Sequence, residues 1–147
     1  MLEIRDCDNY ETAKELIVEY SKIKGAESCF VSLDKELADL GSFYEGGALL
    51  IGYEQGIPVA TVALKRLGDT SAEVKRLYVK PECRGKGYAR ILLEELLSRC
   101  KKLGCKEVTL TTKPDIMGIA HALYKKVGFE ESERSGGTVS MKLVVEK

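Results

Sequence analysis

The first forty residues combine a weak strand pattern with a helical one. Leu2 to Cys7 alternates apolar and polar side chains, as a short strand does. Asp8, with Glu11 three residues later, is typical of a helix start, and Gly25 is typical of a helix stop. The apolar positions between them recur at helical spacing, at Ala13, Leu16, Ile17 and Tyr20. We therefore predict a strand followed by an amphipathic helix.

A second, shorter helix is predicted ahead of the next strands. Ser32 introduces this helix and Gly41 closes it. Its apolar positions share one helical face and are Leu33, Leu37 and Leu40. The stretch Ala26 to Val31 between the two helices has no period and is expected to form a loop, which often shapes a substrate pocket.

Three runs with the composition of strands then lie close together in the chain. Ala48 to Glu54 and Ile57 to Arg66 are separated only by Gln55-Gly56, which is typical of a hairpin turn. Ser71 to Val79 is the third run. Together they predict an antiparallel meander.

The hydrophobic period then changes from two residues to 3.6. The longest apolar stripe ends before Gly104 and consists of Ala89, Leu92, Leu93, Leu96, Cys100 and Leu103. Val108 to Thr112 is typical of a strand. A further helix is capped by Asp115 and stopped by Gly128, and its apolar positions are Ile116, Ile119, Ala120, Leu123 and Val127. The last strand alternates at Val139, Met141, Leu143 and Val145.

The resulting order, β-α-α-β-β-β-α-β-α-β-β, predicts the α/β (α+β) class, in which about four helices pack on the faces of a mixed sheet. A chain of 147 residues fits one domain, and we expect residues 1–147 to form it. Hydrophobic residues make up 44% and charged residues 31% of the chain, which is a globular balance.

The charges and cysteines exclude several classes of partner. The 23 Lys and Arg residues balance the 23 Asp and Glu residues, so we expect neither nucleic acid nor a membrane as partner, and any anion site must be local. Met1 to Asp6 lacks the basic start and apolar run of a secretory signal, which predicts a cytoplasmic protein. The five cysteines form no C-x-x-C pair and His121 is the one histidine, so we expect no metal site and no disulfide framework.

The segment Val79 to Ala89 carries the strongest functional signal. It joins a predicted strand to the longest predicted helix, and Gly85 and Gly87 allow the backbone to approach a ligand closely. The helix start offers unpaired N–H groups, and Arg84 and Lys86 add two positive charges. A lone G-x-G is more often a flexible surface turn, but this context favours a phosphate-binding turn.

These residues resemble the GNAT superfamily of N-acetyltransferases. The phosphate turn of that family follows the pattern Q/R-x-x-G-x-G/A, whose three defined positions are filled here by Arg84, Gly87 and Ala89. Glu73 to Val79 is similar to the family's fourth strand, and Leu123 to Phe129 to its L-Y-x-x-x-G-F ending. The resemblance covers nearly the whole chain and implies the GNAT fold, with a mostly antiparallel sheet that is splayed between strands 4 and 5.

The resemblance also implies acetyl-coenzyme A (acetyl-CoA) as co-substrate. Its pantetheine arm would pair with the backbone of Leu77 and Val79, where the Leu77 amide would polarise the thioester carbonyl. Its pyrophosphate would lie on the amides of Gly85 to Ala89, and Lys126 would reach a more distant phosphate. The implied binding residues are Leu77, Tyr78, Val79, Arg84, Gly85, Lys86, Gly87, Tyr88, Ala89, Arg90 and Lys126. Met117 stands where many members carry an Asn that contacts the cofactor.

Two residues are candidates for proton transfer. Tyr124 matches the family's motif tyrosine, and a phenol with a pKa of about 10 can protonate the leaving thiolate. Tyr124 could instead be a core aromatic residue. Glu73 stands where several members hold a glutamate that deprotonates the amine through water, and strand alternation predicts that it shares a face with Leu77 and Val79. A salt-bridge role is the alternative for Glu73, since solvent can also deprotonate the amine.

The implied function is transfer of an acetyl group from acetyl-CoA to a primary amine of a small molecule or peptide, by direct attack in a ternary complex. The alternative is a non-catalytic acetyl-CoA sensor. A nucleotide-binding protein is disfavoured because no G-K-[ST] follows Gly85. Homodimers are common in the family.

The remaining charges are expected to be solvated. The acidic residues of the first third could attract a cationic amine but are usually solvated, and they are Glu27, Asp34, Glu36, Asp39 and Glu45. The basic residues expected on any half-exposed strand are Lys75, Arg76 and Lys80.

Overall fold

A computed structural model describes residues 2–23, 33–114 and 118–145. Its strands are β1 (Leu2–Asp6), β2 (Ala48–Glu54), β3 (Ile57–Arg66), β4 (Ser71–Val79), β5 (Glu107–Thr112), β6 (Glu130–Ser135) and β7 (Thr138–Val144). Its helices are α1 (Tyr10–Ser21), α2 (Leu33–Ala38), α3 (Leu40–Phe43), the 3-10 helix η2 (Pro81–Cys83), α4 (Tyr88–Lys102) and α5 (Gly118–Val127).

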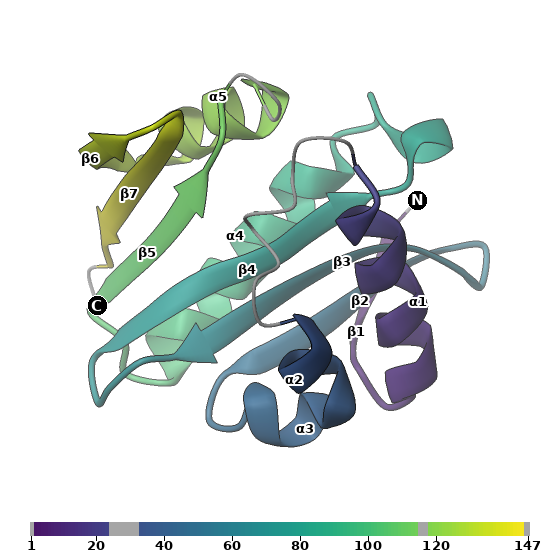
Figure 1. The fold of residues 1–147 in the computed structure, drawn as a ribbon. Helices are drawn as coiled ribbons and strands as arrows, with labels where there is room; N and C mark the ends of the chain where they lie inside the picture. Colours follow the sequence, from purple (N-terminus) through teal and green to yellow (C-terminus); the bar gives the residue numbers. More distant parts are fainter. Residues whose placement is uncertain (1, 24–32, 115–117, 146–147) are drawn as a thin grey trace.

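The strands form one mixed sheet in the order β1-β2-β3-β4-β5-β7-β6 (Figure 1). Strands β4 and β5 run parallel, and the other neighbours run antiparallel. Helices lie on both faces of this sheet. The predicted fold class, a mixed and mostly antiparallel sheet with packed helices, is thereby confirmed.

The helix starts differ from the predicted ones because other polar side chains cap them. Asn9, and not Asp8, caps α1 by accepting a backbone hydrogen bond at 3.1 Å. The second predicted helix is two helices, because the side chain of Asp39 caps α3 in the same way at 3.1 Å. Gly41 therefore lies inside α3. The predicted features outside the described residues are Gly25, the loop Ala26 to Val31, Ser32, Asp115, Ile116 and Met117.

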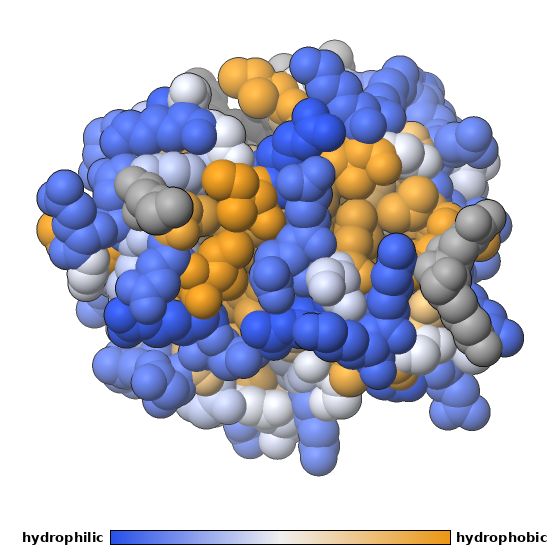
Figure 2. Space-filling view, turned by 180° about the vertical axis from the view of Figure 1, so that it is seen from behind, coloured by the Kyte–Doolittle hydropathy of each residue, from blue (hydrophilic) through white to orange (hydrophobic). Residues whose placement is uncertain are grey.

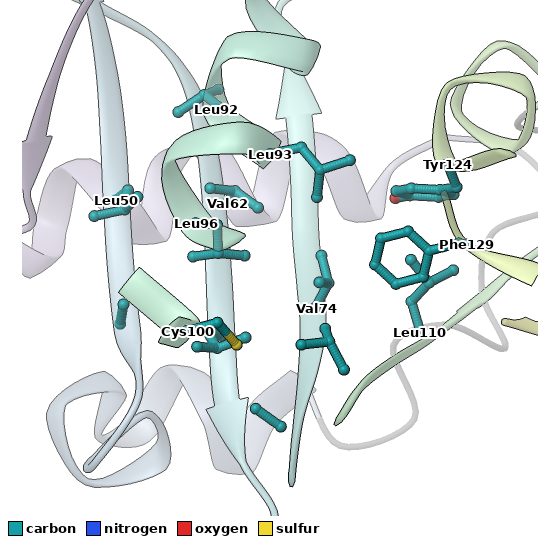
Figure 3. Packing of buried hydrophobic residues seen from close by; sticks show 14 of the residues in the cluster. Leu50, Val62, Val74, Leu92, Leu93, Leu96, Cys100, Leu110, Tyr124 and Phe129 are labelled. Atoms are coloured by element: carbon teal, nitrogen blue, oxygen red, sulfur yellow. The ribbon is translucent and has the colours of Figure 1, made fainter. Parts of the chain in front are cut away.

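Two apolar clusters lie on opposite faces of the sheet. Helices α1 to α3 cover the face toward the viewer in Figure 1, and α4 covers the other face. Leu92, Leu93 and Leu96 of α4 pack on strands β2 to β4, as Figure 3 shows. Leu16 and Ile17 of α1 pack on the opposite face of the sheet, which α1 to α3 cover. A fully buried Leu contributes roughly 1.5–3 kcal/mol, so the predicted stripe is what holds α4 on the sheet.

The surface on the α4 side is not uniformly polar. Figure 2 shows apolar areas on both sides of a central polar band. Half-buried apolar residues from three elements pack against the α4 cluster on this side of the sheet, and they include Ala89, Leu97, Leu123, Val127 and Leu143. Apolar surface therefore lies beside α4 and α5.

Strand β4 changes its alternation at a β-bulge. Ala63 pairs with Lys75 and Thr61 with Tyr78, so β4 has one residue more than β3 between these pairs. Arg76 lies in the bulge with a φ of 61°. Val74 and Val79 belong to the same α4 cluster, although strand alternation would place residues five apart on opposite faces.

Strands β4 and β5 pair only over Ser71–Glu73 and Glu107–Thr109. Beyond these positions the two strands diverge (Figure 1). The predicted splay between strands 4 and 5 is therefore confirmed. Among the described residues, the backbone of β4 from Val74 onward has no paired strand on the β5 side. None of the described helices has the length and apolar character that crossing a membrane requires.

Candidate functional site

The predicted phosphate turn lies between η2 and α4. Gly85 and Gly87 have φ angles of 84° and 80°, in the left-handed region that strains any side chain. A Cβ at either position would meet no atom within 4 Å, so the glycines are required by backbone conformation and not by lack of space. Gly87 is the N-cap of α4 and has no side chain to cap it. The first N–H groups of α4 are therefore available to an anion.

The two cations of the turn have different partners. Arg84 Nε donates to the carbonyl oxygen of Val79 at 2.9 Å, and its guanidinium lies 5.7 Å from the centre of the Tyr78 ring. Lys86 Nζ lies 2.9 Å from Glu54 Oε2 on β2. Arg84 thus ties the turn to the end of β4, whereas the charge of Lys86 is balanced by a carboxylate.

Glu54 is a residue of this site that the sequence pattern did not reveal. Its carboxylate accepts hydrogen bonds from the Tyr88 hydroxyl and from Lys86, and these two donors hold the pKa of Glu54 below its usual value. The carboxylate in turn raises the pKa of Lys86. A glutamate at the end of a strand is ordinary, and only the fold brings it to a turn 32 residues away.

The residues predicted to pair with pantetheine directly follow the bulge of β4. Leu77 is half-buried and Val79 buried, both on the α4 face. Tyr78 points to the other face, where its ring stacks on Tyr20 at 5.1 Å and its hydroxyl donates to Glu19 at 2.5 Å. Burial and this bond raise the pKa of Tyr78. The side chain of Tyr78 therefore belongs to the contact with α1, and its backbone is the part that can meet a ligand.

Three further predicted binding residues lie on α4 and α5. Ala89 is half-buried against the core beside the turn. Arg90 is exposed and its Nε lies 3.4 Å from a carboxylate oxygen of Glu94. Lys126 is exposed in the last turn of α5. The structure thus places Ala89 at the turn, and Arg90 and Lys126 on the outer surfaces of the two helices.

Tyr124 lies on α5 beside the divergence of β4 and β5. It is buried and packs edge to face on Phe129, with ring centres 5.9 Å apart. Figure 3 shows its ring extending from α5 with the hydroxyl end toward β4 and Leu93. The ring is a core residue, and its hydroxyl end is directed to the side on which β4 has left β5. The burial agrees with the core alternative, and the acid role of Tyr124 stays a prediction.

Glu73 lies on the face that α1 to α3 cover. Its cross-strand partner is Lys65, whose Nζ donates to a backbone carbonyl of α3 at 3.0 Å. The prediction that Glu73 shares a face with Leu77 and Val79 is wrong, because the bulge between them shifts the alternation by one residue. Lys75 Nζ lies 4.0 Å from the Glu73 carboxylate. The role of Glu73 as base stays a prediction.

Arg76 and Glu36 are not solvated charges, as the sequence predicted, but a buried ion pair. Arg76 is 6% and Glu36 0% exposed, and Arg76 Nη2 lies 2.5 Å from Glu36 Oε1. The hydroxyl of Tyr44 donates to Glu36 Oε2 at 2.7 Å. Burial and the neighbouring carboxylate raise the pKa of Tyr44. Strand alternation could not show this pair, because it depends on the bulge and on a partner 40 residues away.

Comparison with known proteins gives matches along most of the chain. Residues 11–129 match the model of the acetyltransferase (GNAT) family. Over 133 residues the chain is 33% identical to an uncharacterised N-acetyltransferase of Schizosaccharomyces pombe. This similarity covers 88% of the chain and 79% of that relative.

Solved structures share the fold at lower identity. An acetyltransferase from Streptococcus agalactiae is 19% identical, with a TM-score of 0.81 over 97% of this chain and 98% of that chain. The PaiA N-acetyltransferase of Thermoplasma acidophilum, in complex with coenzyme A, is 24% identical, with a TM-score of 0.78 over 98% and 99%. YncA of Salmonella typhimurium, with its cofactor acetyl-CoA, is 19% identical, with a TM-score of 0.72 over 100% and 95%. These similarities show a common fold.

Proposed function

Because the chain belongs to the acetyltransferase (GNAT) family, we propose that it transfers an acetyl group from acetyl-CoA to a primary amine of a small molecule or peptide. The amine attacks directly while both substrates are bound. The observation that carries this proposal is the open glycine turn at the start of α4, which Arg84 connects to the end of β4, the strand that diverges from β5. The coenzyme A and acetyl-CoA bound in the structures of PaiA and YncA support the choice of donor.

The turn supplies the groups that a diphosphate requires. Backbone N–H groups from Gly85 to Ala89 can donate to phosphate oxygens, and the partial positive charge of the helix start favours an anion. Arg84 is anchored at the end of β4 and adds a formal charge there. Lys86 must share its charge with Glu54, so we assign it a smaller part in binding than Arg84. Tyr88 and Arg90 lie in the first turn of α4, and we assign Lys126 of α5 to a more distant phosphate.

The diverging strands supply the place for the thioester. An unpaired strand edge can bond to the amides of a pantetheine arm as a neighbouring strand would. In this position the Leu77 amide would donate to the thioester carbonyl oxygen, whose negative charge grows as the amine attacks. Tyr78 and Val79 continue the same edge toward the turn.

The chemistry needs two proton movements. The amine nitrogen forms a bond to the carbonyl carbon, and the bond from that carbon to sulfur breaks. Tyr124 gives its proton to the leaving thiolate. The nitrogen loses a proton, and we assign its acceptance to Glu73 through water, or to solvent. The position of Glu73 on the α1 to α3 face means that the amine would enter from that face, opposite to α4.

Calorimetry and a thiol assay test the proposal. We expect saturable heat on titration with coenzyme A and release of its free thiol from acetyl-CoA that depends on an amine. The panel of acceptors should include polyamines, amino acids, antibiotic amines and peptide N-termini. Absence of coenzyme A binding would overturn the proposal. Binding without release for any acceptor of the panel would favour the sensor.

A further inference from the structure

Three buried polar side chains connect helices α2 and α3 to β4. Glu36 accepts hydrogen bonds from Arg76 Nε at 2.9 Å and from Arg76 Nη2 at 2.5 Å. The Tyr44 hydroxyl donates to the same carboxylate at 2.7 Å, and Tyr44 is 5% exposed. We name Arg76, Glu36 and Tyr44 the buried clamp. It fixes two helices of one face to a strand residue that follows 40 positions after Glu36.

The clamp acts on the residue whose backbone forms the bulge. A φ of 61° is unfavourable for a residue with a side chain relative to extended backbone. The bulge turns the side chain of Arg76 to the α2 face, where Glu36 lies. The contact between them therefore favours the bulged conformation over a regular strand.

The bulge lies directly after the point where β4 leaves β5. The last residue of β4 that pairs with β5 is Glu73, opposite Thr109. Leu77 and Val79 follow the bulge and face α4. Without the extra residue, every later side chain and amide of β4 would exchange sides. The direction of the Leu77 amide thus depends on the bulge at Arg76.

Stability is a weak reason for such a clamp. Two charges are expensive to remove from water, and replacing a buried ion pair by apolar side chains is often neutral or stabilising. The best-attested use of a buried polar pair is to fix a register. The clamp fixes the register of β4 at the place where the strand meets its proposed ligand.

We propose that the buried clamp positions the reaction centre: by holding Arg76 in the bulge, it aims the Leu77 amide at the thioester carbonyl. Arg76 is then a positioning residue and does not touch the substrate. This inference rests on the proposed acetyl transfer, because it assigns a purpose to the amide only in that reaction. The geometry of the reaction centre then depends also on residues of α2 and α3.

Three variants separate positioning from folding. Arg76→Met combined with Glu36→Met removes the clamp without leaving an unpaired buried charge. Tyr44→Phe removes one hydrogen bond and keeps the ion pair. Arg99→Met is the control, since it removes an arginine whose guanidinium lies 2.6 Å from Asp6 at the surface. Circular dichroism and urea unfolding report the fold, calorimetry the Kd for coenzyme A and for acetyl-CoA, and thiol release the kcat with the best amine of the panel.

We expect the folded double variant to bind coenzyme A within about twofold of the unaltered chain, because the phosphate turn is intact. The ratio of the two Kd values should shift about three- to tenfold against acetyl-CoA, as for a lost hydrogen bond. Its kcat should fall about 100-fold, as for a displaced oxyanion donor. The kcat and the Kd ratio of Tyr44→Phe should lie between those of the double variant and those of the unaltered chain. Arg99→Met should match the unaltered chain in both.

A folded double variant with unchanged kcat and unchanged Kd ratio would overturn the clamp's role. If the double variant does not fold, Tyr44→Phe decides, and unchanged kcat and Kd ratio in it would overturn the proposal in the same way. If the unaltered chain binds no coenzyme A, the proposed function fails and the positioning role fails with it. If the unaltered chain binds and turns over acetyl-CoA while the clamp variants are unchanged, the proposed function stands and only the positioning role of the clamp is refuted.

Discussion

The tyrosines near the site differ in what their hydroxyls contact. The hydroxyls of Tyr78 and Tyr88 donate to the carboxylates of Glu19 and Glu54. Burial and Glu19 raise the pKa of Tyr78, and the bond to Glu54 raises that of Tyr88. A phenol held by a carboxylate is a weak proton donor to a thiolate. We assign the acid role to Tyr124 because its hydroxyl end is directed toward β4, where that strand has left β5.

The variant Tyr124→Phe tests this assignment. Phe keeps the packing on Phe129 but has no proton to donate, so we expect kcat to fall about 100-fold while the Kd for coenzyme A stays within about twofold. Steady-state thiol release and calorimetry measure the two quantities. Unchanged kcat with unchanged affinity would remove Tyr124 from the mechanism.

Glu54→Gln tests the balance of charge at the turn. The amide can still accept from Tyr88 but no longer neutralises Lys86, so we expect coenzyme A to bind about two- to fivefold more tightly at low salt. This gain should shrink as salt screens the exposed charges. Glu95→Gln is the matched control, because it removes the same charge from a surface ion pair with Arg99. A weaker affinity in Glu54→Gln would mean that its role in bracing the turn outweighs its charge.

At the scale of elements, the turn and α4 have to be considered together. The helix start can offer its N–H groups only because Gly87 turns the chain with a positive φ just before Tyr88. The rest of α4 is fixed by its buried stripe of leucines. We therefore expect the start of α4 to contribute to binding and its buried leucines to contribute to stability.

Two glycine variants separate binding from stability. Gly87 and Gly104 have φ angles of 80° and 82° at the two ends of α4, and a Cβ at either would meet nothing within 4 Å. We expect Gly87→Ala and Gly104→Ala each to lower the free energy of unfolding in urea by about 1 kcal/mol. Only Gly87→Ala should weaken coenzyme A binding in calorimetry, by about tenfold. Equal affinities in both variants would contradict a phosphate site at the turn.

Local patterns predicted the elements whose side chains obey one period throughout. Helix α4 and strand β7 are examples, because one face of each is buried along its length. The bulge of β4 could not be predicted in this way. Its residue Arg76 contacts Glu36, which is distant in sequence, and the bulge places Glu73 and Leu77 on opposite faces of the sheet.

The same limit holds for the candidate site. The glycines and Arg84 could be found because consecutive residues form the turn. Glu54 could not, since a strand from another part of the chain brings it there. Asp39 lies between these two cases. Aspartate is a common N-cap, so a helix start at Asp39 was visible in the sequence, but the helical spacing of the leucines predicted one continuous helix across it.

At the scale of the whole molecule, the sheet consists of two parts joined by the short β4–β5 ladder. One part is β1 to β4, and the other is β5, β7 and β6 with α5 beside them (Figure 1). In the second part, Glu131 of β6 connects the strand to α5. Its carboxylate lies 3.2 Å from Lys125 Nζ and 3.0 Å from His121 Nε2. Charges at the surface thus contribute to holding this part together.

Stability in acid should depend on Glu131. Its hydrogen bond from Arg134, followed by that from Lys125, lowers its pKa to about 2 from 4.5. A lowered folded-state pKa gives stability that is present above about pH 4.5 and is lost as the pH falls toward 2. We expect the free energy of unfolding of Glu131→Gln to fall less steeply over this window in urea titrations. Equal slopes in the variant and the unaltered chain would contradict this expectation, and Glu95→Gln serves as the control.

The shortness of the β4–β5 ladder has a consequence for the lifetime of the protein. If the donor lies in the divergence, as we propose, it would supply bonds that a neighbouring strand would otherwise provide, and it would find no such site in the unfolded chain. At a concentration of 100 times its Kd, such a molecule stabilises the folded state by about 2.7 kcal/mol. We would then expect a shortage of acetyl-CoA to raise the unfolded fraction of the chain and with it the rate of its proteolysis.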